Sequence, residues 1–116
     1  MTVVPVVDLF VGPGGLGEGF AAFTDNNVNV IFEIALSVEK HPTAHKTLEL
    51  RSFFRKFPKN SVPDEYYEYL RGEIPRDHLF HLFPTEADEA RREAWCETLG
   101  SGVELNRRLD SYIKRI

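Results

Sequence analysis

A glycine-dense turn between Gly12 and Gly19 is the feature that most constrains the fold of this chain. It holds five of the eight glycines and follows an apolar, β-branched run at residues 3–7 and the acid Asp8. Glycine has no Cβ atom, so backbone N–H groups in such a turn can approach a ligand closely, and the N-terminus of a following helix favours negative charge. The segment therefore predicts a buried strand, a turn and a helix that together hold an adenine-containing cofactor.

A second strand and a second helix follow. Apolar side chains occupy every second position from Val30 to Val38, which is the period of a strand, and this strand ends in the acid Glu39. Pro42 suits the first turn of a helix that continues to Lys56. Residues 1–57 thus predict a cofactor-binding βαβα unit with two parallel strands joined by a right-handed crossover.

The second half of the chain has a different character. After a loop at residues 57–64, helical patterns cover residues 64–71, 76–83, 85–99 and 103–116, and no third strand is predicted. Gly72-Glu73-Ile74, followed by Pro75, is predicted to be a solvated turn. Residues 58–116 are therefore expected to be a helical insertion or extension of an α/β unit.

Composition excludes several classes of protein. The net charge of −4 offers no general basic face for nucleic acid, so any surface that grips DNA is expected to lie mostly elsewhere. No run approaches the roughly 18 apolar residues that span a bilayer, and the N-terminus lacks the basic flank of a secretory signal. The single cysteine, Cys96, fits a reducing compartment. We expect a cytoplasmic protein with no membrane partner.

The glycine turn and the end of the second strand together resemble two motifs of a known family. Residues 8–20, Asp-Leu-Phe-Val-Gly-Pro-Gly-Gly-Leu-Gly-Glu-Gly-Phe, are similar to the first motif of the cytosine-5 DNA methyltransferases, and Ser37-Val38-Glu39-Lys40-His41 is similar to the second. The order and the separation of the motifs also agree, over roughly the first 56 residues. The resemblance implies an α/β, Rossmann-like S-adenosylmethionine-dependent methyltransferase fold, of which this chain is an N-terminal fragment with a helical second half.

The resemblance also implies a binding site for S-adenosylmethionine. Glu39 would accept hydrogen bonds from the two ribose hydroxyls, and Lys40 would lie beside the adenine, where the family often has an apolar or aromatic residue. A carboxylate suits this role because it only accepts hydrogen bonds, and the carboxyl end of a parallel strand faces the ligand crevice of an open sheet. The alternative is that Glu39 is a charge at the start of the following helix. The other cofactor-binding residues that the resemblance implies are Asp8 at the strand end, Phe10 packed on the ligand, and the backbone of Gly12, Pro13, Gly14, Gly15 and Leu16 along its amino-acid end.

Two parts of the family's catalytic machinery have no counterpart here. The family attacks the cytosine ring with a cysteine in a Pro-Cys motif, assisted by a glutamate from a later motif. Cys96 follows Trp95 rather than proline, within a helical pattern, and is expected to be a small, partly buried residue. The chain alone is therefore expected to be inactive, with no catalytic residue and no metal. DNA would be bound by parts of the parent enzyme that are not present here, and either the extra helices or another copy of the chain would cover the sheet edges.

Two alternative functions remain open on the sequence. Gly12-Pro13-Gly14-Gly15-Leu16-Gly17 also fits the G-x-G-x-x-G fingerprint of a NAD-type dinucleotide-binding fragment, with Glu39 about 20 residues further on. That fingerprint alone is weak, and it does not require the preceding Asp8-Leu9-Phe10. The second alternative is a non-catalytic helical assembly module in which the turn no longer holds a cofactor.

Overall fold

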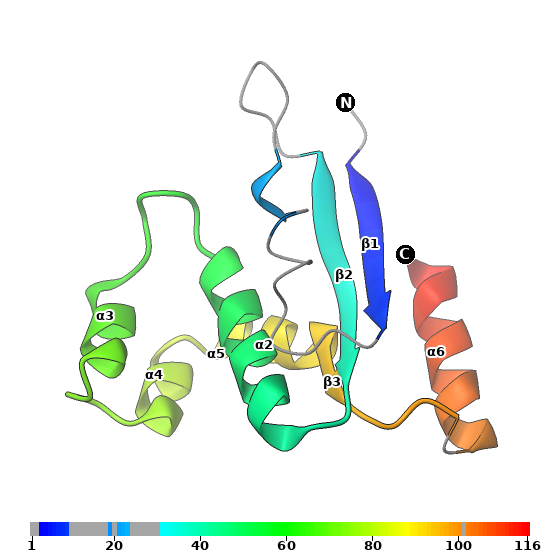
Figure 1. Cartoon of the computed structure of the whole chain (residues 1–116). Helices are drawn as coiled ribbons and strands as arrows, with labels where there is room; N and C mark the ends of the chain where they lie inside the picture. The colour runs from blue at the N-terminus through cyan, green and yellow to red at the C-terminus, as the bar shows by residue number, and fades with distance from the viewer. Residues whose placement is uncertain (1–2, 10–18, 20, 24–30, 101) are drawn as a thin grey trace.

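A computed structural model describes residues 3–9, 19, 21–23, 31–100 and 102–116 of the chain (Figure 1). Most of the glycine turn, including every predicted cofactor residue from Phe10 to Leu16, lies outside these residues. Gly19, Ala21 and Ala22 are helical. They lie between the two predicted strands in sequence, where the crossover helix is expected.

Within the described residues, three parallel strands form the sheet, in the spatial order β1-β2-β3. Strand β1 spans Val4–Leu9, β2 spans Phe32–Glu39 and β3 spans Ala94–Cys96. β1 pairs with β2 in parallel, with Asp8 opposite Ser37, and this confirms the predicted relation of the first two strands. Because parallel neighbours need crossover connections, the helices must lie against the sheet. This architecture fits a fragment of a Rossmann-like methyltransferase.

Strand β3 corrects the prediction that the second half is entirely helical. The helix expected at residues 85–99 begins at Pro84 and ends at Glu93, and the next three residues pair with the end of β2, with Trp95 opposite Val38. Ala94 is extended, with φ −111° and ψ 107°, and its carbonyl accepts a hydrogen bond from His45 Nε2 at 2.8 Å. The backbone of β3 is therefore satisfied by partners far away in the sequence, which a local helical pattern cannot reveal.

Strand β1 is more exposed than the sequence predicts. Val3 is 37% exposed, Val4 46% and Leu9 37%, whereas Ile34, Leu36 and Val38 of β2 are buried. The reason is position: β1 is at one end of the three-stranded sheet and β2 is in the middle. An apolar run like that of β1 is typical of a strand with neighbours on both sides, but the described residues place a strand on one side only.

Helices α2, α3, α4 and α5 follow β2 in the chain, and α6 follows β3 (Figure 1). α2 and α5 contact the sheet, whereas α3 packs on α4 and α4 on α5. Their bounds are Pro42–Arg55 for α2, Asp64–Leu70 for α3, Arg76–Leu82 for α4, Pro84–Glu93 for α5 and Val103–Arg115 for α6. All begin within a residue of the predicted helices. Among the described residues, none of the helices is long and apolar enough to cross a membrane.

The helical second half shares a core with the first half. Phe53 of α2 is fully buried and stacks on Phe80 of α4, with ring centroids 4.7 Å apart. Ala87 and Ala90 of α5, both fully buried, belong to the same cluster, and their small side chains let α5 approach α2 closely. Glu93 at the end of α5 also accepts hydrogen bonds from Ser52 of α2 and from Lys56, the residue that follows α2. These contacts bring the residues before β3 to the edge of β2.

Candidate cofactor site at the carboxyl edge of the sheet

The parallel strands bring three acidic residues to one edge of the sheet. In this register Leu9 lies opposite Val38, and Glu39 lies opposite Cys96. Asp8 therefore lies near the end of β1, Glu39 ends β2, and Glu97 directly follows β3. The carboxyl edge of an open parallel sheet is where ligands of α/β proteins bind.

Glu39 is a buried acid, 6% exposed, at this edge. Its Oε1 accepts a hydrogen bond from the backbone N–H of His41 at 3.0 Å. His41 precedes the first turn of α2 and has no side-chain cap, so the carboxylate satisfies a donor at the helix start. This contact supports the helix-start alternative for Glu39. It does not exclude ligand binding, because a carboxylate offers about four acceptor positions.

A hollow of about 470 Å³ opens beside Glu39. A pocket for a small molecule or cofactor typically measures about 300 to 1,000 Å³. The backbone N–H of Glu97 donates to the Glu39 carbonyl at 3.0 Å and so holds the chain after β3 against the end of β2. The residues that line the hollow come from these two strand ends: Val38, Glu39, Lys40, His41, Glu97, Thr98 and Leu99.

Glu97 is a candidate residue that the sequence prediction missed. Its Oε1 accepts a hydrogen bond from Arg108 Nη1 at 2.9 Å, so α6 orients it. Glu73, in the turn predicted at Gly72-Glu73-Ile74, is exposed and pairs with Arg71 at 2.8 Å, beside Gly72 with φ +77°. The predicted solvated turn is thus confirmed. No local signal marks Glu97, because residues 94–96 lie in a helical sequence pattern and form a strand only by pairing with β2.

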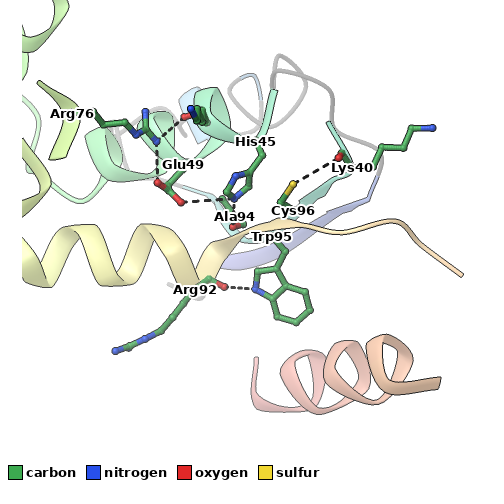
Figure 2. A network of polar contacts seen from close by, with 9 residues as sticks. Lys40, His45, Glu49, Arg76, Arg92, Ala94, Trp95 and Cys96 are labelled. Atoms are coloured by element: carbon green, nitrogen blue, oxygen red, sulfur yellow. Dashed lines mark hydrogen bonds and ion pairs between the residues drawn. The ribbon is translucent and has the colours of Figure 1, made fainter. Parts of the chain in front are cut away.

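Lys40 belongs to the lining of the hollow, and Cys96 lies next to Lys40 but outside that lining. Both are exposed, and Cys96 Sγ lies 3.7 Å from the Lys40 carbonyl oxygen, while the Lys40 side chain extends away from the polar network (Figure 2). The expectation that Cys96 is a partly buried helical residue is wrong. It ends a strand that is only three residues long, so little of the chain covers it.

Asp8 lies in a partly buried position, opposite the buried Ser37. Desolvation raises the pKa of the Asp8 carboxyl above its usual value. The carboxylate form is thus less favourable here than in water, and a positively charged or hydrogen-bonding ligand would favour it. A role for Asp8 in cofactor binding stays a prediction.

A network of polar contacts fixes α2 against β3 behind the hollow (Figure 2). His45 Nε2 bonds the Ala94 carbonyl and lies 3.8 Å from Glu49, whose other oxygen accepts from Arg76 at 3.0 Å. The indole of Trp95 donates to the Arg92 carbonyl at 2.8 Å. These contacts place β3, and therefore Glu97, at the carboxyl edge. Within the described part of the chain, no group of three His, Cys, Asp or Glu residues could hold a metal ion.

The described residues form an open parallel α/β sheet with acids at its carboxyl ends and a hollow between two strand ends. This arrangement is the one found in the class of Rossmann-like proteins that bind nucleotide cofactors. The chain is similar to the Type II methyltransferase M.Bpa9945I of Bacillus paralicheniformis, with 39% identity over 103 residues. The alignment includes 83% of this chain and 22% of that protein, so the chain spans less than a quarter of the relative's length. No family model and no solved structure matches. The similarity supports a methyltransferase, but the name of the relative specifies neither the methylated base nor the methyl donor.

Proposed function

We propose that this chain is the S-adenosylmethionine-binding, N-terminal part of a DNA (cytosine-5-)-methyltransferase. The observation that carries the proposal is the buried Glu39 carboxylate at the end of β2, beside a hollow of about 470 Å³ at the carboxyl edge of a parallel sheet. The similarity to a Type II methyltransferase and the resemblance of residues 8–20 and 37–41 to family motifs support it.

The chain's own residues would bind and orient the cofactor, which supplies the methyl group when bound. Glu39 would accept hydrogen bonds from the ribose hydroxyls, in addition to the one from His41 that it already accepts. Glu97 would take the place of the acid that the family has near the adenine amino group at the end of the third strand. Lys40 would lie at the rim beside the adenine, and Asp8 with the backbone of residues 10–16 would line the amino-acid end.

The parent protein would methylate carbon 5 of cytosine in DNA, in the cytoplasm, and the remaining machinery would lie in its other parts. Cys96 is unsuited to attack the base, because it lacks the preceding proline and its backbone is paired with Glu39 in the sheet. In this proposal residues 1–57 form the cofactor-binding unit. Residues 58–116 form an extension that packs on it and contributes β3.

The proposal predicts that binding depends on the Glu39 carboxylate. Calorimetric titration of the chain with S-adenosylmethionine, its demethylated product and NAD should show preference for the first two. Glu39→Ala should weaken binding by on the order of 2 to 4 kcal/mol, because two charge-assisted hydrogen bonds are lost.

Two further variants separate ligand binding from folding. Glu33→Ala removes the same side chain from an exposed position near the other end of β2 and should leave the affinity unchanged. Glu39→Gln keeps an oxygen that can accept from the His41 N–H, so it should remain folded while losing affinity. Preferential binding of NAD would identify the dinucleotide alternative instead. If none of the three ligands binds, the assembly module is favoured.

A further inference from the structure

Arginines gather around Trp95 on the side of the molecule formed by α6. A shallow hollow of about 350 Å³ lies there, and we call its lining the Trp95 surface. It is distinct from the cofactor hollow, although Glu97 of that hollow binds Arg108 of this surface. The Trp95 surface consists of Trp95, Glu104, Arg107, Arg108, Ser111, Tyr112 and Arg115.

Two of these arginines carry a positive charge that no ion pair with another described residue neutralises. Arg107, Ser111 and Arg115 are spaced four residues apart on α6, so they form one stripe along the helix. Arg107 and Arg115 are exposed, and no ion pair or hydrogen bond joins their side chains to another described residue. In a chain of net charge −4, this is a local concentration of positive charge with a single acid, Glu104, in the lining.

An ordered aromatic ring lies among these charges. The Trp95 indole is held by its bond to the Arg92 carbonyl, by the ring of Tyr112 at 5.3 Å, and by Arg108, whose guanidinium lies 4.8 Å over the ring. Tyr112 is anchored in turn through its hydroxyl, which donates to the Ala35 carbonyl at 2.8 Å. The surface is therefore preorganised and would lose little side-chain entropy on binding.

Charges of both signs from α5 lie near Tyr112. Burial raises the pKa of the Tyr112 hydroxyl and Glu93 raises it further, while Arg92 lowers it, so α5 adds no net positive charge to this surface. Arg92 belongs to α5, whereas Arg107 and Arg115 belong to α6. The Arg92 side chain extends away from Trp95 (Figure 2), so the arginines that line the Trp95 surface all come from α6.

We propose that the Trp95 surface binds the phosphate backbone of duplex DNA. Arginine forks donate paired hydrogen bonds to phosphate oxygens, a serine hydroxyl can add another, and such contacts position a protein on DNA without reading its sequence. The choice of DNA among polyanions rests on the proposed function. Since Glu97 links the two hollows through Arg108, the DNA would pass next to the bound cofactor.

The experiment measures binding of a short labelled DNA duplex to the 116-residue chain by fluorescence anisotropy at several salt concentrations. Trp95 is the only tryptophan, so its emission should change as DNA binds and report contact at this surface. The variant Arg107→Glu/Arg115→Glu should bind at least about tenfold more weakly, and the slope of log affinity against log salt should fall by about two, one per lost phosphate contact.

A matched control changes the same total charge elsewhere. Lys46→Glu/Lys59→Glu alters two exposed lysines on and just after α2, and should keep the salt slope and the Trp95 response. Equal losses in the two double variants, an unchanged slope in the arginine variant, or DNA binding with no change in Trp95 emission would each overturn the proposal. Binding of polyglutamate with no binding of DNA would also overturn it and identify an acidic protein as the partner.

The outcome is separable from that of the proposed function. The arginine variant should bind S-adenosylmethionine as the unchanged chain does, because Arg107 and Arg115 do not line the cofactor hollow. If DNA binds as expected while S-adenosylmethionine does not, the Trp95 surface stands and the cofactor assignment fails.

Discussion

At the scale of single residues, the acids at the carboxyl edge occupy different environments. Glu39 is buried and hydrogen-bonded to the start of α2, and Glu97 is paired with Arg108. Asp8 is partly buried, and this burial raises the pKa of its carboxyl. Ionisable groups whose pKa is shifted by their surroundings are typical of functional sites.

Replacement of Asp8 by asparagine should change the pH dependence of stability. The pKa of Asp8 is higher in the folded than in the unfolded state, so the folded state binds more protons between these two values. The free energy of unfolding contributed by this group therefore falls as pH rises through that window. The difference in the free energy of unfolding between Asp8→Asn and the unchanged chain should therefore shift in favour of the variant as the pH rises from about 3 to about 7. Urea unfolding followed by Trp95 fluorescence at both pH values measures this, and a constant difference between the two proteins would contradict it.

The single-residue predictions differ in how well sequence could support them. Glu39 could be located because it ends a clear alternating strand, and the structure places it at the expected edge. Glu97 could not, because the residues before it were assigned to a helix. The positions of Phe10 and of Gly12 to Leu16 lie outside the described residues and stay predictions.

At the scale of elements, β3 depends on contacts made by α2. Its three residues are too few to be stable alone, and its carbonyl at Ala94 is bound by His45. Glu49 lies beside His45 and is itself held by Arg76 of α4. The short strand is thus positioned by helices from both halves of the chain.

Removal of the His45 side chain should loosen β3. His45→Ala eliminates the bond to the Ala94 carbonyl and should lower the free energy of unfolding by about 1 kcal/mol. Hydrogen exchange should be faster at the Glu97 amide, which bonds the Glu39 carbonyl, because local opening becomes easier. His41→Ala is the matched control, since His41 is exposed and lies one helical turn earlier. Equal exchange rates in the two variants would show that His45 does not hold the strand.

At the scale of the whole molecule, the described residues form one side of the proposed cofactor site. Val4 and Leu9 of β1 and the preceding Val3 remain exposed, and the similar methyltransferase is much longer than this chain. A parallel sheet of three strands, one of which is an edge strand with exposed apolar side chains, is small for the core of an enzyme. Both observations agree with the proposal that catalysis depends on further parts of the parent protein.

The 116-residue chain alone should transfer no methyl group to DNA. Incubation with DNA and S-adenosylmethionine carrying a labelled methyl group should leave the DNA unlabelled, with a complete methyltransferase as positive control. The reason is chemical: the one thiol, on Cys96, lies at a strand end without the proline that precedes the family's nucleophile. Labelled cytosine in the product would overturn this expectation.

The sequence by itself determined β1, β2, α2 and the limits of most helices, because period, proline and glycine positions act over a few neighbouring residues. Only the tertiary structure decided that Ala94–Cys96 is a strand, that Glu97 joins Glu39 beside one hollow, and that the arginines of α6 gather around Trp95. The physical reason is the same in each case. The stabilising partners, Val38 for Trp95, Ala94 for His45 and Glu97 for Arg108, come from separate elements, and these meet only when the sheet and its helices pack together.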